Sequence, residues 1–157
     1  MLTLLLVLLL AAHILGALFW VGGMAFAYTM LRPAAGSLEA PVRLTLWCDV
    51  FRRFLPWVGV SILALLVSGY AMLFLIYGGF ARAPLYVHVM QGLGILMMLI
   101  YGHLYFVPWQ RLQKLVAAAD WPNAGKQLAM IRKLVAINLA LGVIVVLVGS
   151  TGRYWGW

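Results

Sequence analysis

Three histidines lie in or beside apolar stretches of this sequence, where an ionisable side chain is costly. His13 is inside the first stretch, and His88 and His103 belong to the third. Polar groups within a membrane span are candidates for a functional site by default. Neutral imidazole is a good ligand for haem iron and for copper, so these residues predict metal or cofactor chemistry.

His13 and His88 are expected to lie at a similar depth. His13 precedes Arg32 by 19 residues, and His88 precedes Arg111 by 23 residues. At about 1.5 Å per residue these separations are about 28 and 34 Å. The difference of about 6 Å is within the reach of helix tilt. We therefore expect haem b between the first and third spans, bound through His13 and His88.

The neighbours of these histidines leave room for a flat ring. At about 100° per residue, Trp20 lies close to the direction of His13, and Gly92 follows His88 by one turn. With Gly16 they are the expected lining of a porphyrin slot, which a helix bundle holds by imidazoles from facing helices. The alternative is that the glycines only let helices approach and that each histidine hydrogen-bonds a neighbouring helix.

A second metal site is geometrically allowed in the inner half. His103 and Met24 each lie eight residues from their anchoring arginines, Arg111 and Arg32, and so share a depth. Imidazole and thioether would suit a haem or a soft metal there. The eight methionines of the chain keep copper as an alternative cofactor. Four polar residues are interpreted as interhelical hydrogen-bonding groups: Ser61, Ser68, Gln91 and Asn138.

Other chemistries lack their residues. The expected spans hold no carboxylate, so a proton relay of the Asp or Glu type is not predicted. No serine has a plausible histidine and acid pair, and neither a phosphate-binding loop nor a zinc spacing occurs. Cys48 is the single cysteine and is interpreted as a small apolar filler, with a metal-relay thiol as the alternative.

The composition is that of a membrane protein. Hydrophobic residues make up 66% of the 157 residues, charged residues make up 9%, and the mean hydropathy is +1.06. Long, continuous apolar runs without alternation predict helices, so the expected fold is an all-α bundle of four transmembrane helices in one domain, 1–157. The expected spans are 2–31, 55–80, 85–109 and 131–152. Residues 41–54 are expected as a separate interfacial helix, with Pro56 beginning the second span.

The basic residues predict the orientation. Nine of the eleven Lys and Arg residues fall in the first and third connections, and only Arg82 and Arg153 fall elsewhere. By the positive-inside rule, those connections are cytoplasmic and both termini are periplasmic, as in a multi-pass protein of a bacterial-type inner membrane. The net charge of +8 favours contact with anionic lipid. A nucleic-acid partner is not expected, because the charges are dispersed among loops.

The first span also resembles a known family. The stretch from His13 through Trp20 to Gly22 and Gly23 is similar to the first-span signature of the copper resistance protein D superfamily, which includes four-helix HemJ-type porphyrinogen oxidases. The rest of the chain is similar to a small, stand-alone member, in Leu85–His88, Tyr101–His103, Pro108–Trp109 and 132–142.

The resemblance implies an inner-membrane bundle that holds haem b in the HemJ-type branch and moves copper in the other. His13 and His88 match the membrane histidines of these proteins. Met90 stands where the HemJ-type pattern has a lysine, so porphyrinogen oxidation is not expected and enzymatic activity stays open. The expected function is a haem b protein that transfers electrons between a quinone or small substrate and a partner protein. Copper transport or resistance through His and Met ligands is the alternative.

Overall fold

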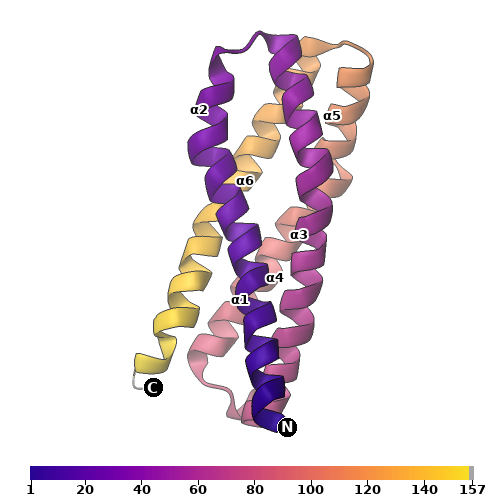
Figure 1. Cartoon of the computed structure of the whole chain (residues 1–157). Coiled ribbons are helices and arrows are strands. Elements are labelled where there is room, and N and C mark those ends of the chain that lie inside the picture. The colour runs from indigo at the N-terminus through magenta and orange to yellow at the C-terminus, as the bar shows by residue number, and fades with distance from the viewer. Residues whose placement is uncertain (156–157) are drawn as a thin grey trace.

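The computed structural model describes residues 1–155 of the chain, and in them it contains four long helical limbs and no strand (Figure 1). The first limb is α1 (Leu2–Phe26), which continues through a π-helical turn (Ala27–Leu31) into the short α2 (Arg32–Ala34) and a 3-10 turn (Ala35–Ser37). The others are α3 (Ala40–Tyr77), α4 (Leu85–Phe106) with α5 (Pro108–Ala117), and α6 (Trp121–Thr151), and 3-10 turns occupy Phe80–Arg82 and Gly152–Tyr154.

All four limbs are long and apolar enough to cross a membrane. The candidate spans are Leu2–Ser37, Ala40–Tyr77, Leu85–Ala117 and Trp121–Tyr154. Helices satisfy every backbone polar group internally, which a segment in lipid requires. The all-α fold class with four spanning helices, expected from the apolar runs, is therefore confirmed.

The segment 41–54 is not a separate interfacial helix. It forms the first part of α3, which continues without a break through Pro56. Four of its apolar residues are buried by protein, because they pack with α4, α5 and α6 into one cluster: Leu44, Trp47, Cys48, Phe51, Leu55, Leu104, Trp109, Leu112, Ala124, Leu128 and Ile131. The amphipathic pattern of 41–54 thus includes a side that faces the bundle.

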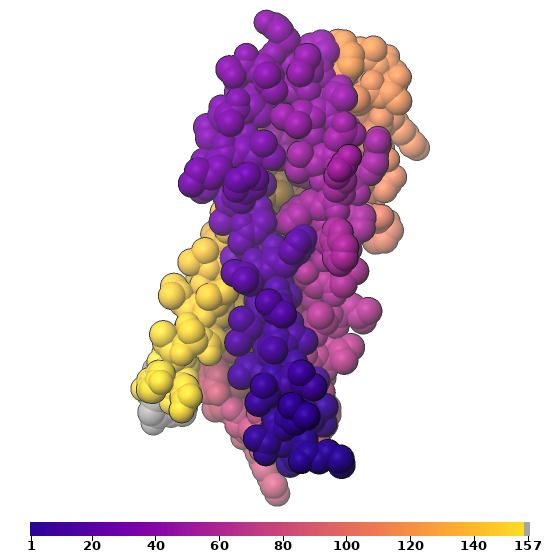
Figure 2. All heavy atoms as spheres, in the orientation of Figure 1, coloured from indigo at the N-terminus to yellow at the C-terminus, as the bar shows by residue number. Residues whose placement is uncertain are grey.

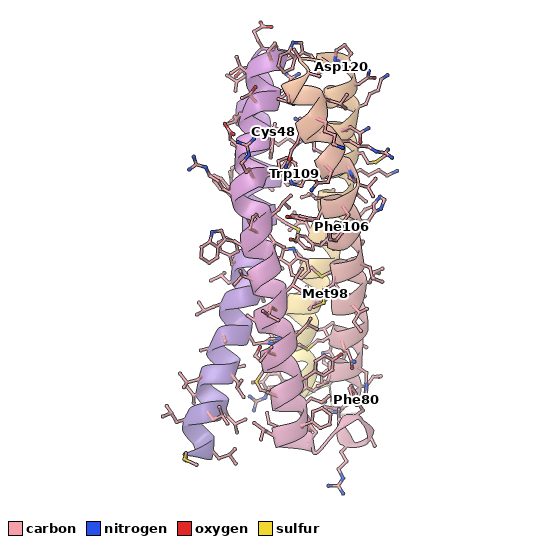
Figure 3. The ribbon with its side chains drawn as sticks, turned by 90° about the vertical axis from the view of Figure 1, so that its right-hand side faces the viewer. Cys48, Phe80, Met98, Phe106, Trp109 and Asp120 are labelled. Carbon is pink, nitrogen blue, oxygen red and sulfur yellow. The ribbon has the colours of Figure 1, made fainter. Side chains whose placement is uncertain are left out.

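The connections follow ordinary helix-end chemistry. Asp120 caps α6 by accepting a hydrogen bond from the Asn123 backbone N–H, as its sequence position predicts. Gly78 ends α3 in the left-handed conformation, with φ of 70°. Asp120 and Phe80 mark opposite ends of the bundle (Figure 3). The start of α1 and the end of α6 lie at the same end as the connection between α3 and α4 (Figure 1).

The packing sets the positions of the candidate residues. The principal helix contacts are α1 with α3, α4 with α6, and α5 with α6. The first and third spans are therefore not a principal packing pair. A second buried cluster lies at mid-depth and consists of Trp20, Met24, Val58 and Met97.

Candidate functional site

His13 lies against α3. Its Nδ1 is 2.9 Å from Ser68 Oγ. The Ser68 hydroxyl proton is directed to the Ala64 carbonyl, one turn back on α3. Since a hydroxyl has one proton to give, Ser68 accepts from His13 and Nδ1 carries the ring proton. The other nitrogen, Nε2, then keeps its lone pair and can bind a metal.

Two glycines bring α1 and α3 together around this imidazole. A Cβ at Gly69 would lie 3.1 Å from His13 Cε1, so the ring rests on the bare backbone of α3. A Cβ at Gly16 would lie 3.2 Å from the Ser61 carbonyl oxygen and 3.3 Å from a Leu65 side-chain carbon. Gly16, expected to line a cofactor, is therefore a contact point between two helices, as small residues commonly are in membranes.

Trp20 and Met24 point into the centre of the bundle. Both side chains are 3% exposed, as is Met97 of α4, and all three belong to the mid-depth cluster. The Trp20 ring meets Tyr101 of α4 edge-on, with ring centroids 6.4 Å apart. Tyr101 in turn donates a hydrogen bond to the Leu55 carbonyl. Aromatic rings thus fill the space between the first and third spans at this depth.

His88 and Gly92 lie on the outer surface of the bundle. Both residues are exposed, and a Cβ at Gly92 would meet no atom within 4 Å. The hydrogen bond of His13 goes to Ser68 of α3, and α1 and α4 are not among the principal packing pairs. The structure therefore does not bring together the two histidines that the sequence pairs.

The same holds for the expected inner site. His103 is exposed on α4, at a position one turn before the exposed Phe106, whereas Met24 is buried in the central cluster. These two residues do not share a site in the described structure. Met97 is the methionine that packs with Met24.

Three of the four polar residues expected to join helices do so. Besides Ser68, Gln91 of α4 donates to the Tyr70 hydroxyl of α3, and Asn138 of α6 donates to the Met97 carbonyl. Ser61 is the exception, because its hydroxyl bonds to the Trp57 carbonyl of its own helix. Back-bonding of this kind satisfies a serine without a partner helix.

The usual metal-binding side chains are not clustered. Within residues 1–155, no three His, Cys, Asp or Glu side chains gather where they could hold one ion. Cys48 of α3 is buried in the cluster that α3, α4, α5 and α6 form together, and it lies near Trp109 in Figure 3. It packs there as the expected apolar filler. The interior offers thioether sulfurs and a single ordered imidazole.

One comparison with known proteins finds a match. A family model described as copper resistance protein D matches residues 48–151, which is more than half of the chain. The match begins within α3, so the first span with His13 lies outside it. No curated protein and no solved structure matches the chain.

Proposed function

The chain belongs to the copper resistance protein D family, and we propose that it is a multi-pass membrane protein that handles copper through ligands inside its helix bundle. Thioether and imidazole are ligands that Cu(I) accepts readily, whereas hard cations prefer oxygen. The observation that carries the proposal is the placement of methionine sulfur in the bundle interior of a member of this family.

The contacts of two glycines of α6 show at which level along the bundle axis these ligands lie. A Cβ at Gly142 would lie 2.9 Å from Val21 and 3.2 Å from Met97, and a Cβ at Gly149 would lie 3.2 Å from Met90. Met90 is therefore two turns, about 10 Å, from Met97 toward the chain termini. His13 is about 12 Å from Val21 in the same direction. His13 and Met90 thus share one level.

The resulting order of ligands suits stepwise handling of a soft ion. His13, with Nε2 free, and Met90 stand at the level nearer the chain termini. Met97 and Met24 stand at mid-depth in one buried cluster, with Met98 packed against it. We assign Met24 and Met97, which pack in one buried cluster, to one copper station. His13 on the α3 side and Met90 on the α6 side are separate candidate ligands at the level nearer the chain termini.

A competition titration tests the proposal. The purified chain is titrated with Cu(I) under anaerobic conditions against a colorimetric chelator. Met97→Leu conserves volume but removes the sulfur, so it should lower Cu(I) affinity by roughly tenfold, the scale on which residues around a metal act. Met130→Leu is the matched control, because Met130 is exposed on α6. No Cu(I) binding by the unaltered chain, or equal losses in both variants, would refute the proposal.

Haem b with a redox role is the alternative that the sequence favours. The arrangement of His13 and His88 does not support a porphyrin held between the first and third spans, because His88 is exposed on α4 while His13 packs against Ser68 and Gly69 of α3. The absorption spectrum of the same purified protein distinguishes the two functions, since a haem protein is red-brown and a Cu(I) protein is colourless.

A further inference from the structure

Three arginines from three helices line one cavity at the end of the bundle opposite the chain termini. Arg32 of α2, Arg43 of α3 and Arg132 of α6 border a space of about 610 Å³. Arg32 and Arg43 both lie close enough to Arg132 to act on it electrostatically. Like charges gathered in a partly desolvated site repel one another and favour an anion.

No carboxylate of residues 1–155 neutralises this cluster. The one ion pair in that part of the chain joins Arg52 to Asp49, outside the cavity. Arg32 and Arg132 instead lie over the rings of Tyr28 and Trp47, with guanidinium carbon to ring centroid distances of 4.9 and 5.7 Å.

Two buried donors beside the cavity lack an acceptor. Nε of Arg132 and Nε1 of Trp47 are both buried without a hydrogen-bond partner in the described structure. Buried N–H groups are nearly always paired, so their state here indicates that an acceptor belongs in the site. An anion that reached Arg132 would supply one.

An apolar slot continues from the arginines into the bundle. It has a volume of about 540 Å³, and it shares Tyr28, Arg32 and Arg132 with the first cavity. Phe19 and Phe26 of α1 line it and are 43% and 61% exposed, so the slot opens sideways between α1 and α3. Figure 2 shows a hollow with the first limb, near α2, on one side and α3 on the other.

The backbone of the first limb departs from a regular helix at this slot. The turn Ala27–Leu31 is π-helical, and both of its end residues line the slot. Such turns widen a helix locally and occur frequently at functional sites. On the neighbouring part of α1, Gly23 has no side chain, and the ring of Phe54 occupies the position that a Cβ would take. Phe54 lines the same slot.

We propose that this site binds an anionic phospholipid, with its phosphate at the three arginines and an acyl chain in the slot. Guanidinium groups match phosphate geometry and bind it by paired hydrogen bonds. Basic pockets between spanning helices on the cytoplasmic side are suited to acidic headgroups, and the orientation expected from the basic residues puts this end there. An apolar slot open to the bilayer fits the tail of the same molecule.

Lipid-dependent thermal stability tests this site. The full chain, purified in neutral detergent, is unfolded with added phosphatidylglycerol, phosphatidylcholine or inorganic phosphate. Phosphatidylglycerol should raise the midpoint, and the other two should not. Arg132→Gln and Arg32→Gln should each weaken the apparent affinity for phosphatidylglycerol roughly fivefold, the scale of one basic residue near an acidic membrane surface. Arg111→Gln, at the same end but outside both cavities, should leave the affinity unchanged.

Several results would overturn the proposal. Equal unfolding midpoints with phosphatidylglycerol and phosphatidylcholine would show that the site does not recognise the negative charge of the headgroup. An equal rise in the unfolding midpoint with inorganic phosphate alone would show that the site binds a free anion. If Arg111→Gln lowered the affinity for phosphatidylglycerol as much as Arg32→Gln, the binding would depend on the net charge of the protein and not on the cavity. A coloured tetrapyrrole that co-purifies and is lost in both cavity variants would assign the slot to that ligand. Arg32 is exposed, so Arg32→Gln keeps the test decisive where Arg132→Gln fails to fold.

Discussion

Ser68 determines which nitrogen of His13 is free to bind a metal. Its hydroxyl proton is directed to the Ala64 carbonyl, so the oxygen accepts from Nδ1 and leaves Nε2 available. Groups that orient a ligand in this way commonly change metal affinity by 10- to 100-fold when they are removed. The function of His13 therefore depends on a residue 55 positions away in the sequence.

Replacing Ser68 by alanine should lower Cu(I) affinity roughly tenfold, because the imidazole loses the acceptor that fixes its tautomer. Ser61→Ala is a matched control: Ser61 is also buried and also bonds back to its own helix, but it does not contact His13. The competition titration measures both variants. Equal affinities in Ser68→Ala and the unaltered chain would contradict the assigned role of the hydrogen bond.

The identity of the ligands was only partly predictable at this scale. His13 could be found from the sequence, because a histidine inside an apolar run is unusual. Helical periodicity relates His88 to Gly92 on the same helix, but it does not say which neighbour α4 turns toward. The structure turns Met97 inward and His88 outward, and no single-sequence signal fixes that rotation.

Along the helices, some glycines lie at close helix contacts and others lie on the open surface. Gly16→Ala should destabilise the protein by about 1–3 kcal/mol, because its Cβ would press on the Ser61 carbonyl and the Leu65 side chain. Gly92→Ala should instead stabilise it by about 0.5–1 kcal/mol, because Gly92 is helical and faces open space. Unfolding in detergent, followed by helical circular dichroism, measures both. Destabilisation by Gly92→Ala would indicate a partner or cofactor at that face.

The course of α3 gives a second prediction for the helices. Since residues 41–54 pack inside the bundle, the thiol of Cys48 should react with a maleimide only after denaturation. A cysteine placed at the exposed neighbour Asp49, in a Cys48→Ala background, should react in the folded protein. Rapid labelling of Cys48 before denaturation would contradict the buried arrangement and favour a loosely attached interfacial helix.

The helical limbs themselves were largely predictable, because long apolar runs leave few alternatives. Their ends were less so. The sequence predicts Pro56 as the start of a span, yet Pro56 lies within α3. The helix continues on the N-terminal side of Pro56, because burial of Leu44, Trp47 and Phe51 against other helices stabilises that part. Pro108, by contrast, does begin a new helix, after a break at Val107 with φ of −115° and ψ of −82°.

For the whole molecule, the distribution of charge predicts how the bundle sits in the membrane. Reporter fusions at Ala35 and Asn123 should report the cytoplasm, and fusions after Gly79 or at the C-terminus should report the periplasm. The structure places the connection that follows α3 and the end of α6 at one end of the bundle (Figure 1), so the fusions after Gly79 and at the C-terminus must agree with each other. The opposite pattern would move the arginine cavity to the outer leaflet and remove the leaflet argument for its lipid.

The metal content of the purified chain tests most directly whether the chain handles copper. The protein is purified from cells grown with added copper, and copper and iron are quantified per polypeptide together with the absorption spectrum. We predict stoichiometric copper, no haem absorption, and loss of copper in a Met24→Leu, Met97→Leu double variant. Haem iron in stoichiometric amount without copper would contradict the claim.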